Sequence, residues 1–515
     1  MNRSVGLWAA ACAAAMVCTA AYAAPSQVWA EVGDGRFRSD IELLADSGVV
    51  DLPLNDWPIP IADIDRVMSK VDREKLKAPA LRAAYDRIEN AIRPTNENGL
   101  HVAEVDLAAG HPSLLRDYDT PAREDGDLSA EVVDYGYRWA AELNLTYAVD
   151  PRDGQPFRMD DSNLTFRFGN WLLSLNTLDK WWGPSYETSL ILSDNARPMP
   201  AIELDRATSA PIDLPVLRWL GPWRFIMYFA AAEEHRPDVD DSLFYGTRLS
   251  WRPLRFLEVG AELTTQWCGH YANPVVEDES HRDCNLTMLK NVIVGNDTTQ
   301  YAGVTGAKPG HAQAGYEARL NSPWTFIPLA VYVQEIGNDE IHRLPARLMK
   351  QQGIESWLNL ANGDTIKGFA EYTDSTCGAE RNPPEFYIGT PPNATLCAYT
   401  NSVFLAGYRY RGLNIGDTAD ADSILRTVGL RWDRSAGDEW QMKFQSGHFN
   451  RGNVAGPYDL VSPYGASLYD SVQAEYRRPV FGGDLFVQVG AERQRPAEEI
   501  GNGRGFGYLA WSRAL

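Results

Sequence analysis

Apolar and polar residues alternate along many segments of this chain, and this pattern limits the possible folds more than any other feature. The first long run begins at Val133, after which Tyr135, Tyr137, Trp139, Ala141, Leu143, Leu145, Tyr147 and Val149 alternate with mostly polar neighbours. Such alternation predicts a β-strand with one apolar and one polar face. A run of this length can cross a lipid bilayer when the strand is tilted.

Similar runs follow, and the links between them differ in length. The runs are Leu257–Trp267, Ala312–Leu320, Ile424–Trp432, Trp440–Phe444, Val472–Tyr476 and Leu485–Ala491. Short, turn-prone links occur at Gly221-Pro222, Arg252-Pro253, Ser322-Pro323, 435–438 and 479–484. Long links occur at 235–242, 268–310, 336–353, 412–423, 448–467 and 495–503. Short and long links largely alternate, although their order is ambiguous at 160–210 and 350–402. This layout is typical of outer-membrane barrels.

We therefore predict a mainly β protein whose residues 130–515 form a transmembrane, up-and-down antiparallel β-barrel. The runs suggest roughly 16 to 20 strands, an even number being expected. Mean hydropathy is −0.34, which a soluble periplasmic β-sandwich or propeller would also show. That soluble alternative stays open on composition alone, and fractionation of membranes discriminates it.

The N-terminus predicts export. Residues 1–23 combine a short basic start, an apolar alanine-rich run and an Ala21-Tyr22-Ala23 cleavage signal, which together predict a signal peptide. The alternative is an N-terminal membrane anchor, for which the apolar run is short. We expect the mature chain to begin near Ala24, in the envelope of a Gram-negative bacterium.

The segment after the signal peptide has a helical period. Apolar residues between 61 and 71, and again between 81 and 92, recur at spacings of three and four, which predicts amphipathic helices. The acidic stretch 117–127 resembles a linker. We assign 24–125 to a small helical domain and linker, on the periplasmic side if the barrel starts and ends there.

Four cysteines remain after removal of the signal peptide. They are Cys268, Cys284, Cys377 and Cys397. An even number in an exported chain predicts disulfides, and we favour 268–284 and 377–397 among the three possible pairings, because each pair falls inside one loop-like segment. Free thiols, or a metal site formed by Cys268, Cys284 and nearby histidines, are the alternatives.

Charge excludes one class of partner. The formal net charge of −21 argues against nucleic acid, which requires a basic surface. An acidic polysaccharide would likewise have to meet local Arg and Lys side chains. Two aspartate groups, at 417–422 and 238–241, have no EF-hand spacing, so we expect solvated acidic loops there, and neither a metal nor a cofactor.

One stretch resembles a known family. Trp181-Trp182-Gly183-Pro184, then 189–193, then Asn195-Ala196-Arg197-Pro198 and Pro200 match the pattern of the Wzi capsule assembly family at the right spacing. Weaker likeness extends to Leu217–Trp223, Gly407–Gly412, 420–423 and Ile41–Pro60. The outline thus covers most of the mature chain, and 179–206 is its specific part.

The resemblance implies a monomeric outer-membrane barrel of about eighteen strands, with a plugged lumen and a periplasmic helical domain whose protein partner, if any, is unidentified. It implies a lectin-like protein that anchors capsular polysaccharide or a related exopolysaccharide at the cell surface. It does not imply an enzyme. The nearest nucleophile motif, 445–450, lacks a Ser two residues after its His, and no Gly-x-Ser-x-Gly elbow occurs.

Within the matching stretch, Trp181, Trp182, Asn195 and Arg197 are the candidate polysaccharide-binding residues. Indole rings stack on the apolar faces of sugars, and Asn and Arg bind hydroxyl and carboxylate groups. The alternative is a structural role, because adjacent Trp residues in a strand point to opposite faces. Outer loops would then supply the contacts, through residues such as Tyr271, Trp357 and Tyr458. A diffusion porin or sugar-uptake channel is the second functional hypothesis.

Overall fold

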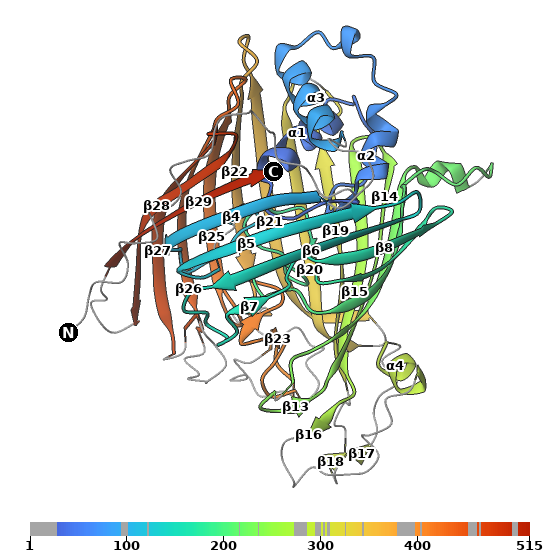
Figure 1. Ribbon diagram of the computed structural model, residues 1–515. Helices are drawn as coiled ribbons and strands as arrows, with labels where there is room; N and C mark the ends of the chain where they lie inside the picture. Colours follow the sequence, from blue (N-terminus) through green and yellow to red (C-terminus); the bar gives the residue numbers. More distant parts are fainter. Residues whose placement is uncertain are drawn as a thin grey trace.

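The computed structural model describes most of the mature chain as one closed β-barrel with helices at one end (Figure 1). It describes residues 28–93, 101–120, 123–215, 217–234, 236–271, 286–293, 300–301, 304–305, 310–324, 326–341, 344–377, 397–401, 404–451, 461–462, 465–496 and 503–514. The predicted signal peptide, residues 1–23, lies outside these ranges. In the described part of the chain no helix is both long and apolar enough to span a membrane.

Eighteen strands of the described residues close the barrel, each antiparallel to its neighbours. They are β4 (His101–His111), β5 (Gly126–Tyr135), β6 (Trp139–Ala148), β8 (Asn163–Phe168), β9 (Trp171–Asn176), β11 (Ala201–Arg206), β12 (Trp223–Ala231), β14 (Leu243–Leu254), β15 (Leu257–Trp267), β19 (Gly310–Asn321), β20 (Leu329–Ile341), β21 (Leu344–Asn359), β22 (Thr365–Asp374), β25 (Ile424–Asp433), β26 (Glu439–Phe449), β27 (Ser467–Val480), β28 (Gly483–Pro496) and β29 (Gly503–Ala514). The short β7 (Phe157–Arg158) pairs with β6 beside β8. The predicted fold class is confirmed.

The wall has an apolar outside and a polar inside. Along β22, buried and half-buried residues alternate without a break, so that Lys367 and Glu371 point inward while Ile366 and Ala370 point outward. Inside, Arg248 is fully buried and ion-pairs with Glu262 and Glu317 of the next two strands. Outward leucine, valine and phenylalanine side chains are exposed all around the barrel. This inverted arrangement suits a barrel surrounded by lipid.

Helices close one end of the barrel, which we call the helical end (Figure 1). They are α1 (Gly35–Asp46), α2 (Ile61–Met68) and α3 (Pro79–Ile92), with the 3₁₀ turn η2 (Arg73–Lys75). Their apolar faces share one core with side chains of the barrel wall, as the helical period predicts. Two short pairings secure this unit: β1 (Trp29–Ala30) with β3 (Ile59–Pro60), and β2 (Asp56–Trp57) with β10 (Trp181–Trp182).

Helix α1 is held by buried charges. Glu42 accepts hydrogen bonds from Lys367 of β22 at 2.9 Å and from Arg38 at 2.8 Å. The hydroxyl of Tyr186 also donates to Glu42. Burial alone would raise the pKa of Glu42, but Lys367 and Arg38 hold this pKa well below its usual range. The helix is therefore tied to the barrel wall and to the lumen at one carboxylate.

Two inserted segments fill the lumen. Residues 177–200 connect β9 to β11, and residues 397–423 precede β25 and contain the hairpin of β23 (Arg409–Tyr410) and β24 (Leu413–Asn414). Apolar side chains of both segments pack together in one buried cluster with the wall, including Leu190, Tyr399 and Tyr408. The Tyr399 hydroxyl donates to the Leu190 carbonyl at 2.7 Å. The lumen of the described structure is thus occupied by the chain itself.

Link lengths differ between the two ends. Tight turns at 136–138, 169–170, 255–256 and 481–482 lie at the helical end, whereas the opposite end, the loop end, carries long segments such as 232–242 and 375–423. The loop end also bears β13 (Val239–Asp240) paired with β16 (His270–Tyr271), β17 (Gln300–Tyr301) paired with β18 (Val304–Thr305), and α4 (Leu286–Ile293). One long link, 207–222 with the 3₁₀ turn η3 (Leu217–Leu220), lies at the helical end.

Two sequence predictions need correction. The predicted loop 336–353 is instead the tip of the β20–β21 hairpin, whose strands pair from Leu329↔Ser356 to Ile341↔Leu344. The barrel also begins earlier than residue 130, because β4 pairs with both β29 and β5 and lies inside the segment 24–125 that we assigned to the helical domain and linker. The acidic stretch after β4 is folded into the lumen, where Asp117 is buried.

The predicted 377–397 disulfide is present and ties the end of β22 to the second inserted segment. Cys268 is also disulfide-bonded, while its expected partner Cys284 lies outside the described residues. The 268–284 pairing therefore stays a prediction.

Candidate functional site

The β23–β24 hairpin places an arginine and a tyrosine at the loop end. Its tight turn is Arg411-Gly412, and both residues have positive φ, 49° and 83°, which Gly412 adopts without a steric cost. The Arg411 guanidinium lies over the Tyr410 ring, 5.3 Å from its centroid, and is partly exposed. The hairpin thus presents a cation at the loop end, while the Tyr410 ring beneath it is buried.

Carboxylates and arginines continue from this hairpin around the lumen. Arg197 ion-pairs with Asp153 at 2.5 Å and with Asp160 at 2.7 Å, and Asp153 also lies 3.9 Å from Arg411. The first two contacts are short enough for charge-assisted hydrogen bonds. We call Asp153, Asp160, Arg197, Tyr410 and Arg411 the charged rim.

A polar cavity of about 320 Å³ adjoins the rim inside the barrel. Asp160 belongs to both. We call the two inserted segments, 177–200 and 397–423, the plug. The cavity lies between the plug and the wall of β5, β6 and β29, and is lined by Arg116, Arg123, Asp179 and Asp194. Arg123 donates two hydrogen bonds to Asp179, at 2.8 and 2.6 Å, and Arg116 bonds Asp194 at 3.1 Å. The interior charges are thus arranged in pairs.

Burial changes the protonation of this cavity. It raises the pKa of Asp194 to about 6, against the opposing effect of Arg116. Burial also lowers the pKa of Arg116, whereas the attraction of Asp179 outweighs burial and raises the pKa of Arg123. At mildly acidic pH, where Asp194 is protonated, the cavity therefore carries less negative charge than its number of aspartates suggests.

Rim and cavity together offer the groups that bind carbohydrate. Guanidinium groups donate to sugar hydroxyls and pair with uronate carboxylates, while aspartates accept from hydroxyls. In the described residues no group of three or more His, Cys, Asp or Glu side chains is arranged to hold a metal ion.

The structure gives Trp181 and Trp182 a structural role. Both side chains are fully buried. Trp181 donates through Nε1 to the Ser185 carbonyl at 3.1 Å, and its ring meets Tyr118 edge to face at 5.4 Å. Trp182 packs against Tyr228 in the same manner. Neither indole leaves a face free for a sugar ring, so the structure does not bring Trp181 and Trp182 to the candidate site, and their part in polysaccharide binding stays a prediction.

Asn195 and Arg197 lie nearer to the loop end. The Asn195 amide donates to the Asn414 carbonyl at 2.9 Å, and its own carbonyl accepts from Arg123 at 3.2 Å. Asn195 thus joins the two inserted segments beside the cavity. Arg197 belongs to the charged rim, so the structure brings only this one of the four predicted residues to the candidate site.

The loop residues suggested as alternatives are divided. Trp357 is buried near the helical end, in the core shared with the helices, and so cannot meet a ligand at the loop end. The structure does not describe the side chain of Tyr271, and Tyr458 lies outside the described residues. Tyr410, Arg411, Asp153 and Asp160 were missed, since nothing in the sequence predicts that their separate segments converge.

The first aspartate group is not a solvated loop, and the second is solvated only in part, because Asp241 is exposed whereas Asp238 is buried. Asp417, Asp420 and Asp422 are buried, and Asp420 pairs with Arg409 at 2.6 Å. Asp238 is likewise buried and pairs with Arg236 at 2.8 Å. Their role is to bind the inserted segments and loops to one another.

A family model and a solved structure point to the same family. A family model described as capsule assembly protein Wzi matches residues 95–495. An uncharacterized 55.8 kDa protein of the cps region of Klebsiella pneumoniae is 26% identical over 333 residues, which is 63% of this chain and 61% of that relative. Among solved structures, the outer-membrane, carbohydrate-binding β-barrel Wzi of Escherichia coli group 1 capsule assembly superimposes with a TM-score of 0.77 at 22% identity. That superposition covers 94% of this chain and 99% of the solved one.

Proposed function

This chain belongs to the Wzi family of capsule assembly proteins, and from that premise we propose that it binds capsular polysaccharide or a related exopolysaccharide and holds it at the cell surface. The family assignment over most of the chain is the observation that carries the proposal. The solved relative of the same fold is described as carbohydrate-binding and as involved in capsule assembly. The filled lumen favours this role over that of a diffusion porin.

We place the protein in the outer membrane with its helical end in the periplasm. Outer-membrane barrels carry short periplasmic turns and long outer loops, and the tight turns lie at the helical end of this barrel. The loop end then faces the medium, where a surface polymer is found. The protein acts as a monomer and as a binding protein without catalysis.

The charged rim and the adjoining cavity are the proposed contact region for polysaccharide. Arg411 is partly exposed and lies over an aromatic ring, so it can approach a sugar without unfolding the plug. The net charge of −21 repels an acidic polymer at long range, so its carboxylates have to be bound by such local cations.

Binding of the purified protein to purified polysaccharide tests this proposal. The detergent-solubilised barrel is immobilised, and exopolysaccharide isolated from the source cell is passed over it. Saturable retention is the expected result, with a neutral dextran of similar length as the control polymer. Equal retention of both polymers, or of neither, would contradict a specific carbohydrate-binding role.

A further inference from the structure

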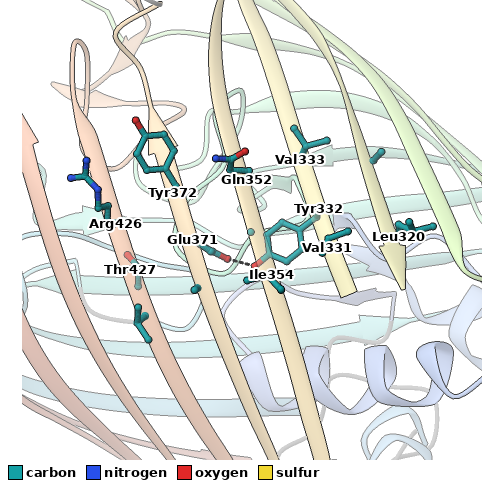
Figure 2. A pocket seen from close by; sticks show the side chains of 14 residues that line it. Leu320, Val331, Tyr332, Val333, Gln352, Ile354, Glu371, Tyr372, Arg426 and Thr427 are labelled. Carbon is teal, nitrogen blue, oxygen red and sulfur yellow. Dashed lines mark hydrogen bonds between the residues drawn. The ribbon is translucent and has the colours of Figure 1, made fainter. Parts of the chain in front are cut away.

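The outer wall of the barrel carries a groove beside its apolar belt. Two adjoining hollows, of about 620 and 580 Å³, follow strands β19 to β27 and share Ile354, Ala370 and Val428. We call them together the outer-wall groove. Figure 2 shows the first hollow, with Arg426 and Tyr372 neighbouring each other and Ile354 closer to Val331.

Small residues on the central strand create this groove. Ala370 of β22 lies between Ile354 and Val428 of the flanking strands, and Gly368 lies between Ser356 and Leu430. A Cβ atom added at Gly368 would meet only ordinary contacts, at 3.9 Å. The hollow therefore reflects missing side-chain volume, and a larger residue at Gly368 would fill it without displacing the backbone.

Toward the loop end, the groove ends at a row of polar side chains from three neighbouring strands. Tyr372 pairs in register with Gln352 on one side and with Arg426 on the other. The Arg426 guanidinium lies 5.5 Å from the centre of the Tyr372 ring. The Tyr372 hydroxyl donates to Asp374 at 3.3 Å. The surface thus changes from apolar at the Ala370–Val428 pair to cationic at the next outward pair, Tyr372–Arg426.

Arg426 supplies the cation of this row. It is exposed and, within the described part of the chain, forms no ion pair. By contrast, the neighbouring Lys350 lies 3.9 Å from Glu335. A cation held at the edge of a lipid-facing apolar surface attracts an anionic group at that depth.

A second outer groove offers a comparison. It measures about 950 Å³ and follows β5 to β14, with Leu143, Leu175 and Phe229 in its lining. None of the described residues in that lining is a lysine or an arginine. Hydrocarbon alone suits the second groove, whereas the outer-wall groove suits hydrocarbon joined to an anion.

We propose that the outer-wall groove is a binding site for one phosphate-bearing acyl lipid of the membrane leaflet at the loop end. The acyl chain lies over Gly368 and Ala370, and the phosphate is bound by Arg426 with Gln352 beside it. The proposal rests on the membrane location inferred above but not on polysaccharide binding. It would give the barrel a fixed lipid neighbour on one side of its wall.

Native mass spectrometry of the purified barrel in detergent tests the site. The probes are diphosphoryl lipid A and, as the phosphate-free comparator, a diacylglycerol of the same chain length. The wild type is expected to retain one lipid A and no diacylglycerol. The variant Arg426→Gln should weaken retention by about tenfold, the size of one charge-assisted hydrogen bond, and Gly368→Leu should abolish it by filling the groove.

Matched variants distinguish the site from general lipid contact. Arg493→Gln removes another exposed, outward arginine near the loop end of β28, and Ala141→Leu fills the second groove; both should bind as the wild type does. Equal weakening by Arg426→Gln and Arg493→Gln would overturn the proposal. The proposal would also be overturned if the wild type formed dimers and Gly368→Leu alone abolished them, because a second copy of the chain would then occupy the groove. Heat-dependent gel mobility confirms folding, and Ala370→Leu replaces Gly368→Leu if that variant fails to fold.

Discussion

At the scale of single residues, Asp417 gives the clearest link between burial and protonation. Its carboxylate is fully buried in the second inserted segment and accepts a hydrogen bond from the Ala419 amide at 3.1 Å. Burial raises the pKa of Asp417 to about 7. The folded chain therefore binds this proton more tightly than the unfolded chain does.

The sign of the effect on stability follows directly. A raised pKa in the fold means that the contribution of Asp417 is fully present below its unfolded pKa, about 4, and is lost as pH rises to about 7. We expect Asp417→Asn, which keeps the hydrogen bond but cannot ionise, to become more stable than the wild type across that window, by at most about 4 kcal/mol. Urea unfolding followed by gel mobility at several pH values measures it, with Asp213→Asn in an exposed turn as control. Parallel curves for Asp417→Asn and wild type would refute the buried proton.

Arg411 is the residue on which the proposed polysaccharide contact depends most. We expect Arg411→Gln to lower the affinity for an acidic polysaccharide by about tenfold, through the loss of one charge-assisted contact. The control is Arg218→Gln, since Arg218 is exposed at the helical end. The same polysaccharide-retention assay measures both. An unchanged affinity in Arg411→Gln, or an equal loss in both variants, would remove the rim from the site.

Only part of the site could be predicted at this scale. The residue types were suggested by the family pattern around 179–200, and Arg197 does lie at the rim. The exposure of a side chain in an inserted segment depends on how that segment folds back, which local pattern does not encode. Trp181 and Trp182 therefore appear as sugar-binding candidates in sequence, although the fold uses them to join the plug to β2 and to Tyr228.

At the scale of elements, helix α1 is locked to the wall through Glu42. We expect Glu42→Ala to destabilise the protein by about 3–5 kcal/mol, because the buried cations Lys367 and Arg38 would both lose their nearest carboxylate. The matched control is Glu89→Ala on α3, whose partner Arg93 is exposed, with an expected loss below about 1 kcal/mol. Urea midpoints of the two variants measure the difference. Similar small losses in both would show that Glu42 does not tie the helix to the barrel.

Strand periodicity predicted most of the wall for a physical reason. A strand with lipid outside and a polar lumen inside must alternate, so the pattern of β15, β25 or β26 is visible in the sequence alone. Strand β4 was missed because alanines at 103, 108 and 109 are weak strand formers. The tip of the β20–β21 hairpin was mistaken for a loop because polar residues replace the apolar ones there.

At the scale of the whole molecule, the filled lumen predicts a barrel that does not conduct ions. The inserted segments and the helices occupy the interior through buried apolar packing and ion pairs. We expect the purified wild type to show no steady ion conductance in a planar lipid bilayer, where a porin of similar strand number serves as the positive control. A stable, voltage-independent conductance of porin size would favour the channel hypothesis instead.

Retention of polysaccharide on living cells tests the central claim most directly. Wild-type and deletion cells are compared for polymer held on the cell, polymer shed into the medium, and total synthesis. The account predicts that the deletion sheds polymer while total synthesis stays unchanged, and that the Arg411→Gln variant restores retention only in part. Unchanged retention in the deletion, with normal synthesis, would contradict a role in holding polysaccharide at the cell surface.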